Sequence, residues 1–279
     1  MTFLLDLIKT FVLGIVEGIT EWLPISSTGH MLLVDKIFTL NQPEAFKEMF
    51  FVVIQLGAII AVVVIFWKKM WPFQKNSNSR SVINMDIMRM WFKVAVACIP
   101  SAVLGFFLDD WLEEHFGGPV TIAMMLIIYG IAFIVVENWN KTRESKIKKL
   151  SGISYSTAFL IGLFQVLSMI PGTSRSGATI IGALIIGVSR TAAAEFTFFL
   201  AVPTMLGASL LKLVKFGFNF NFGQFIILIF GMIVAFIVSL LCIRWLMSFI
   251  KKNDFKPFGI YRIILGALVL LLTCFGVFK

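Results

Sequence analysis

The chain has 279 residues, of which 59% are hydrophobic and only 14% are charged. Soluble domains carry about 25% charged residues, so this composition excludes a water-soluble globular protein. The formal net charge of +9 does not indicate nucleic-acid binding, because the Lys and Arg residues lie mostly between apolar runs, where they set membrane topology. We therefore expect an integral membrane protein without a nucleic-acid partner.

The predicted elements form two successive sets. Segment 4–38 has two apolar helical stretches around a polar turn, and neither stretch is long enough to cross a bilayer alone. Such a broken segment predicts a re-entrant hairpin, whose irregular backbone must be buried in protein or line a cavity. Segment 155–190 predicts a second hairpin of the same kind. Six apolar runs are long enough to span the membrane: 49–67, 91–108, 119–136, 192–211, 224–243 and 258–278.

Charges in the connections predict the orientation. Basic connections after the first, third and fifth spans are expected in the cytoplasm. The acidic segment 109–114 is expected outside as a loop, and Lys212 and Lys215 are exceptions to the pattern. The basic residues used are Lys68, Lys69, Lys75, Arg80, Arg89, Lys141, Arg143, Lys146, Lys148, Lys149, Arg244, Lys251, Lys252 and Lys256.

The two hairpins also resemble one another. Segment 14–17 aligns with 162–165, and at the same offset 26–29 aligns with 174–177. Each hairpin is followed by three spans, an odd number, so the second half should be inverted relative to the first. The fold expected is an all-α single membrane domain, 1–279, of two inverted repeats, about 1–140 and 150–279. Their interrupted segments should meet near the midplane.

The first hairpin carries acids, hydroxyls and an imidazole. Glu17 and Glu21 are four positions apart, so on a helix they share one face. Two carboxylates in an apolar stretch need a metal ion, an arginine or a proton to offset them, unless the pair is wetted at the membrane surface. The turn then supplies the hydroxyls of Ser26, Ser27 and Thr28. His30 follows and can exchange a proton near neutral pH.

The second hairpin carries a cation and an anion-binding turn. Glycine at 172 lets the backbone approach a ligand closely, and successive amides at a helix start favour an anion. Arg175 adds a planar, permanently charged fork that matches phosphate oxygens. The two hairpins are therefore complementary around a phosphate. The substrate-binding residues expected are Glu17, Ser26, Thr28, Gly172, Thr173, Ser174, Ser176 and Thr179.

Two motifs resemble those of the undecaprenyl-diphosphate phosphatases of the bacitracin-resistance (BacA/UppP) family. One is E-x-x-x-E, from Glu17 to Glu21, followed by SSTGH; the other is P-G-x-S-R-S-x-x-T, from Pro171 to Thr179. The resemblance covers essentially the whole chain. It implies hydrolysis of the C55 isoprenyl diphosphate, dependence on a divalent metal ion (Mg²⁺ or Ca²⁺), and a site in the bacterial cytoplasmic membrane that opens to the outer side.

The roles expected follow from these residues. Arg175 would grip phosphate, Glu17 and Glu21 would hold the metal, and Ser27 would attack phosphorus or align water. His30 or Glu21 would take the proton, and the sequence leaves this choice open. The alternative is a flippase or transporter, because inverted repeats with broken helices are a common transporter design. Partners expected are the lipid diphosphate, membrane lipid and, as one option, a second copy in a homodimer.

Overall fold

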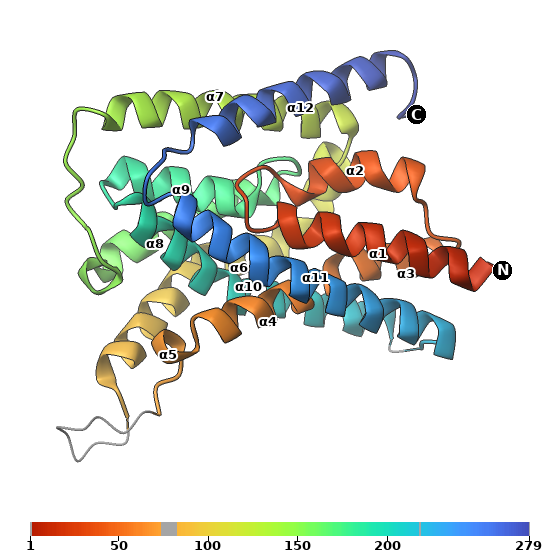
Figure 1. Ribbon diagram of the computed structural model, residues 1–279, viewed down its shortest axis with the longest axis horizontal. Coiled ribbons are helices and arrows are strands. Elements are labelled where there is room, and N and C mark those ends of the chain that lie inside the picture. Colours follow the sequence, from red (N-terminus) through yellow and green to blue (C-terminus); the bar gives the residue numbers. More distant parts are fainter. Residues whose placement is uncertain (1, 74–82, 218, 279) are drawn as a thin grey trace.

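The computed structural model describes residues 2–73, 83–217 and 219–278, and within these ranges the chain is helical with no β-strand (Figure 1). One isolated parallel bridge joins Ile147 to Val188. The all-helical prediction is therefore confirmed. Lys75 and Arg80, which we used to place a connection in the cytoplasm, lie outside the described residues.

Helices follow one another with short connections. The first half holds α1 (Thr2–Thr20), α2 (Ser27–Ile37), α3 (Glu44–Val53), α4 (Gln55–Ile65), α5 (Trp67–Met70), α6 (Met85–Phe116) and α7 (Pro119–Asn140). The second holds α8 (Tyr155–Val166), α9 (Arg175–Ile186), α10 (Arg190–Phe216), α11 (Phe222–Phe249) and α12 (Lys256–Cys274), with 3-10 turns η1 (Leu150–Gly152) and η2 (Leu167–Met169).

Six helical segments of the described chain are long and apolar enough to cross a membrane, as expected, so the protein is a multi-pass membrane protein. They are Glu44–Ile65, Met85–Leu108, Pro119–Asn140, Arg190–Phe216, Phe222–Phe249 and Lys256–Cys274.

Two details of the spans differ from the sequence prediction. The first span is broken at Ile54, between α3 and α4, rather than being one helix. The acidic segment 109–114 is not a loop, because α6 continues through it to Phe116. The charged residues end the apolar run in the sequence. The helix continues past that point because Leu, Trp and Glu are adequate helix formers.

The segments predicted as hairpins contain paired helices joined at a non-helical turn. Helices α2, α8 and α9 have 11, 12 and 12 residues, too few to span. Helix α1 is longer than expected, since its 19 residues extend about 28 Å at 1.5 Å per residue. Its last turn carries the buried Glu17, so this end of α1 lies inside the protein.

The hairpin helices pack against equivalent partners. Helix α1 packs on α11, and α8 packs on α6. Gly162 is essential to the second contact, because a Cβ there would lie 2.2 Å from the carbonyl oxygen of Ala97. Gly14, its counterpart on α1, would bring a Cβ to 2.9 Å from the Cβ of Val234. Helices α7 and α12, the last helix of each half, pack on each other. The main helix contacts therefore follow the same pattern in the two halves.

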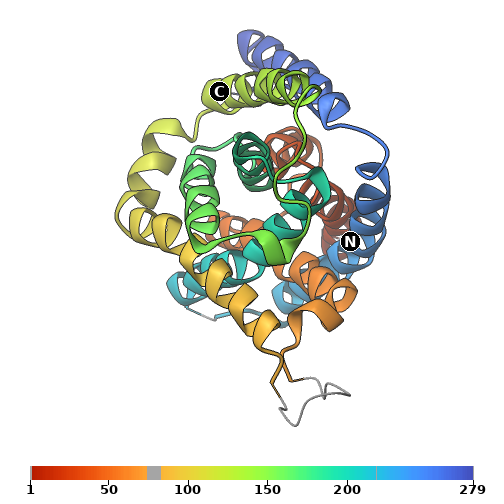
Figure 2. The ribbon, with the colours of Figure 1, turned by 90° about the vertical axis from the view of Figure 1, so that its left-hand side faces the viewer.

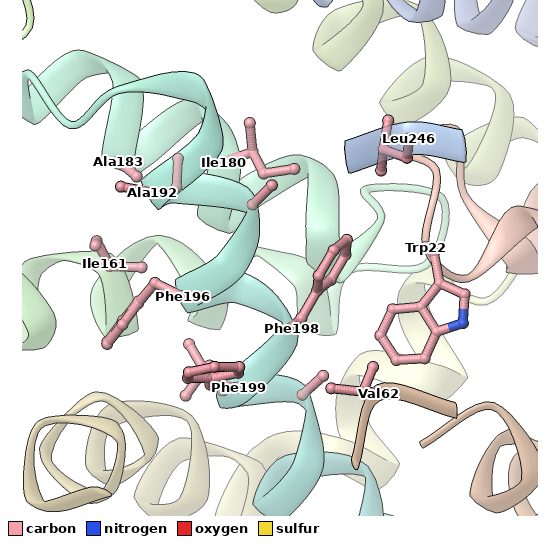
Figure 3. Close-up of a cluster of buried hydrophobic side chains, with 14 of the residues drawn as sticks. Trp22, Val62, Ile161, Ile180, Ala183, Ala192, Phe196, Phe198, Phe199 and Leu246 are labelled. Atoms are coloured by element: carbon pink, nitrogen blue, oxygen red, sulfur yellow. The ribbon is translucent and has the colours of Figure 1, made fainter. Parts of the chain in front are cut away.

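The hydrophobic core surrounds the second hairpin. Figure 2, viewed along the long axis, shows other helices around α9, and residues 176–184 of α9 are all buried. In Figure 3, Trp22 from the first hairpin turn lies beside Phe198 of α10, with an edge-to-face ring contact at 5.3 Å between centroids. The tips of both hairpins are thus held in one packed core.

The two ends of the molecule carry different segments. The start of α1 and the end of α12 lie at one end in Figure 1, whereas α5 and the connection from α7 to α8 lie at the other. Most of the spanning helices run roughly along the long axis in Figure 1, which is therefore the expected direction of the membrane normal.

Candidate active site

The first tip is shaped by Pro24 and Ser26. Helix α1 ends at Thr20, a turn follows, and α2 begins at Ser27. Ser26 is the N-cap, and its hydroxyl accepts a hydrogen bond from the Gly29 amide at 3.4 Å. Its backbone φ is +74°, a left-handed conformation that non-glycine residues rarely adopt. Such strain is characteristic of functional sites held by the surrounding structure.

The second tip repeats this geometry at Ser174. Its φ is +69°, and its hydroxyl accepts from the Gly177 amide at 3.2 Å, capping α9. Among the described residues, Ser26 and Ser174 are the two non-glycine positions with positive φ. These are the two serines that the sequence alignment places opposite each other. The preceding Gly172 has φ +92°, and a Cβ there would lie 2.5 Å from the Ile122 carbonyl oxygen, so this position requires glycine.

The two tips meet through Glu21. Arg175 donates from Nη2 to Glu21 Oε1 at 2.7 Å, although the residues are 154 positions apart in the sequence. Ser27 donates from Oγ to the other carboxylate oxygen, Oε2, at 2.8 Å. Both oxygens of Glu21 are therefore engaged, one by a cation and one by a hydroxyl.

Glu17 lies beside this pair and is almost completely buried, with 1% of its surface exposed. It interacts electrostatically with both Glu21 and Arg175. Its Oε1 has no hydrogen-bond partner among the described residues. An unpartnered buried carboxylate oxygen is costly, so Glu17 requires a proton or a further cation.

Serine 176 anchors the second tip to the first. Its hydroxyl donates to the backbone carbonyls of Glu21 and Leu23, at 3.3 and 3.4 Å. The Ser174 hydroxyl lies 3.2 Å from it. The buried Ser176 therefore joins the tips directly and is engaged by protein groups.

His30 is turned away from Ser27. Its Nδ1 lies 2.7 Å from the Ser26 carbonyl oxygen, which can only accept, so Nδ1 carries the hydrogen. Its Nε2 lies 2.8 Å from the Tyr261 hydroxyl, and the two rings stack with centroids 5.5 Å apart. In the neutral imidazole the Tyr261 hydroxyl donates to Nε2. Of the two bases expected for Ser27, the structure places Glu21, not His30, at hydrogen-bond distance.

Other residues expected at the site divide into exposed and enclosed ones. Thr28 is exposed on α2. Thr173 is completely buried, and its hydroxyl has no partner among the described residues. Thr179 is also completely buried, one helical turn below Arg175, where its hydroxyl donates to the Arg175 carbonyl oxygen at 2.9 Å. It also lies 2.9 Å from the Thr197 hydroxyl, so its visible contacts join α9 to α10.

Comparison with known proteins identifies the family of the chain. The family model described as bacitracin resistance protein BacA matches residues 10–268. The chain belongs to this family. An undecaprenyl-diphosphatase of Enterococcus faecalis is 66% identical over 269 residues, which cover 96% of this chain and 98% of that protein. Proteins of the same description from Desulfitobacterium hafniense and Streptococcus pyogenes serotype M1 are 60% and 54% identical, covering 96% and 98% of both chains, respectively.

One residue at the site of this BacA-family chain was missed by the sequence prediction. Arg262 lies on α12, in a run that we read only as a membrane span, and its side chain is completely buried. It donates to the carbonyl oxygens of Pro24, at 3.2 Å, and of Gly172 and Thr173, both at 2.9 Å. The sequence did contain a signal for Arg262, because charged residues inside a membrane span are rare and usually have a function.

Proposed function

We propose that this chain hydrolyses undecaprenyl diphosphate to undecaprenyl phosphate and inorganic phosphate, which recycles a lipid carrier for cell-wall synthesis. The observation that carries the proposal is the Glu21 carboxylate, held between the Ser27 hydroxyl and the Arg175 guanidinium. A hydroxyl with an adjacent base and a phosphate-binding cation are the parts that phosphoryl transfer needs. The names of the BacA-family relatives favour this reaction over the flippase alternative.

Arg175 and the start of α9 bind the diphosphate in this scheme. The first amides of an α-helix have no partner within the helix, so they favour an anion. The incoming phosphate competes with Glu21 for the guanidinium of Arg175. When Arg175 turns to the phosphate, Glu21 is released to accept the proton of Ser27. The ion pair found between the tips is therefore the resting state of the site.

Ser27 performs the chemical step. Its Oγ forms a bond to the terminal phosphorus while the bond from that phosphorus to the bridging oxygen breaks. The Ser27 proton passes to Glu21, and undecaprenyl phosphate leaves. Water then hydrolyses the phosphoserine, releasing inorganic phosphate and restoring the hydroxyl. The first step is supported by the 2.8 Å contact from Ser27 to Glu21.

A divalent metal ion, Mg²⁺ or Ca²⁺, is part of the proposal. No group of three or more His, Cys, Asp or Glu residues that could hold a metal occurs among the described residues. Mg²⁺ nevertheless binds through one or two carboxylates completed by water and substrate phosphates. The unpartnered Oε1 of Glu17 fits that pattern. Glu21 would join it through Oε1, the oxygen that Arg175 leaves when it turns to the phosphate. The ion would neutralise charge on the phosphates.

The tips are proposed to be re-entrant hairpins of an inverted-topology repeat. Support comes from the shared positive φ and shared capping bond of Ser26 and Ser174, and from the matched packing of α1 on α11 and of α8 on α6. Basic connections at the end that carries α5 support a cytoplasmic location for that end. The site is then entered from the outer side. The homodimer stays a prediction, which crosslinking in membranes tests.

Phosphate release from farnesyl or undecaprenyl diphosphate by purified protein tests the function. We expect release with Mg²⁺ or Ca²⁺ and strong inhibition by EDTA. Glu21→Gln should fold and release almost no phosphate. Absence of release by the wild-type protein with metal present, together with transport of the lipid across vesicles, would establish the flippase instead.

A further inference from the structure

Arg262 lies on α12, outside both hairpins, yet its guanidinium reaches both hairpin tips. Nη1 donates to Pro24 of the first tip, and Nη2 donates to Gly172 and Thr173 of the second. Longer bonds of 3.4 Å run to the carbonyls of Leu126 and Met125 on α7. We propose that Arg262 is a positioning residue for phosphate hydrolysis, which fixes the two tips against each other and turns the amides at the start of α9 toward the phosphate.

The orientation of the amides follows from the planarity of the peptide group. In a trans peptide the C=O of one residue and the N–H of the next point in opposite directions. The Thr173 carbonyl points at Arg262, so the Ser174 amide points away from it. Ser174 is also the N-cap of α9, with a positive φ. Arg262 thereby fixes the plane of the first peptide in the proposed phosphate cradle.

The surroundings of Arg262 contain backbone acceptors but no paired carboxylate. Its hydrogen bonds within the described chain all end on carbonyl oxygens, and the Tyr129 ring lies under the guanidinium at 5.7 Å. A buried cation without an acidic partner is costly. Close to the tips, its charge favours an anionic ligand. A diphosphate would supply the negative charge that the protein does not.

Arg190 provides the contrast within the same chain. It lies at the start of α10 and binds the completely buried Glu137 with Nε at 2.9 Å and Nη2 at 2.5 Å. The two charges of that ion pair cancel, and the 12-residue helix α9 separates Arg190 from the second tip. Arg190 is therefore a structural arginine, and it serves as the matched control for Arg262.

The inference rests on the proposed hydrolysis, so wild-type phosphate release is measured first; its failure would remove the function, whereas the variants below test Arg262. Arg262→Met, Arg262→Lys and Arg190→Met are compared by kcat, KM and thermal unfolding in detergent. We expect Arg262→Met to lower kcat about 100-fold in folded protein, since an error of about 1 Å in a catalytic group has such an effect. Arg262→Lys should recover part of kcat, because an ammonium keeps the charge but has only three donors.

The control separates positioning from simple stability. Arg190→Met should lower the unfolding temperature while leaving kcat of the folded fraction within about threefold of wild type, since it is remote from the reacting groups. Equal kcat losses in Arg190→Met and Arg262→Met, or wild-type kcat in folded Arg262→Met, would overturn the proposal. If Arg262→Met does not fold, Arg262→Lys decides: wild-type kcat in that variant overturns it, and a loss of about tenfold at an unchanged unfolding temperature supports it.

Discussion

The two hairpin tips share a backbone and differ in chemistry. Ser26 and Ser174 have φ of +74° and +69°, and each caps its helix through a glycine amide three positions on. The residue after each serine differs. Ser27 bears a hydroxyl that reaches Glu21, and Arg175 bears a guanidinium that reaches the same carboxylate. One scaffold therefore presents a hydroxyl in one half, which we propose as the nucleophile, and a guanidinium in the other, which we propose binds phosphate.

The helices that precede the tips differ in the same way. Glu17 on α1 aligns with Gln165 on α8, and each has one buried side-chain oxygen without a partner among the described residues. Gln165 also donates to the Ser101 hydroxyl at 2.6 Å, and it carries no charge. The amide needs only hydrogen bonds, whereas the carboxylate needs a positive charge as well. The metal requirement is thus expected in the first half alone.

The largest effect should come from Arg175. Arg175→Ala removes the guanidinium that pairs with Glu21 and that we propose binds the diphosphate. We expect kcat/KM for phosphate release to fall about 10³-fold or more. Arg175→Lys should retain part of the activity because it keeps the charge without the planar fork. Arg244→Ala, at an exposed position on α11, is the control and should be unaffected. Full turnover in Arg175→Ala would contradict the proposal that the second tip binds phosphate through Arg175.

Ser27 and Thr28 test the first tip at adjacent positions. Ser27→Ala should lower kcat about 10³-fold, because the attacking oxygen is lost, while exposed Thr28→Ala should change it less than about tenfold. Acid quenching of the wild-type enzyme followed by mass spectrometry should detect phosphate on Ser27. Should His30→Ala equal the loss in Ser27→Ala while Glu21→Gln stays active, the proton acceptor would be His30.

Glu17 and Gln165 test the metal in matched positions. Glu17→Gln places at position 17 the residue found at the aligned position 165. It should raise the Mg²⁺ concentration for half-maximal phosphate release at least about tenfold. Gln165→Ala should leave that concentration unchanged and cost about 1 kcal/mol of stability, through its bond to Ser101. A Mg²⁺ titration at fixed substrate measures the first effect, and chemical unfolding in mixed micelles measures the second. An unchanged titration in Glu17→Gln would remove Glu17 from the metal site.

The smallest effects should come from the two capping serines. Ser26→Ala and Ser174→Ala lose the cap and keep the strained φ, so each should lower the free energy of unfolding by about 1 kcal/mol. Ser→Gly also loses the cap but relieves the strain, so it should cost only about a few tenths of a kcal/mol. Unfolding in mixed micelles compares all four variants. A clear difference between the Ser26 and Ser174 series would show that the two caps are energetically unequal.

The sequence by itself determined the features that depend only on residues close together in the chain. Apolar length predicted the six spans, and the motifs at 17–30 and 171–179 predicted the chemical groups of both tips. The acidic residues at 109–114 predicted a loop, but α6 continues through them. The last span was recognised by its apolar length, and Arg262 within it was not identified as a site residue. The first error arose because acidic residues end an apolar run without ending a helix. The second arose because a membrane span is recognised from its average composition, which a single residue barely changes.

Tertiary structure alone decided which groups meet. His30 reaches Tyr261 across 231 positions, and Arg175 reaches Glu21 across 154, so no local pattern records either contact. Ser27 and His30 are close enough in sequence to permit a pairing, yet the His30 ring binds the Ser26 carbonyl instead. Helical spacing fixes the face that a side chain occupies, but the partners on that face are set by packing. Contact between helices distant in the sequence therefore placed Arg175 with Glu21 and brought Arg262 to the carbonyl groups of both tips.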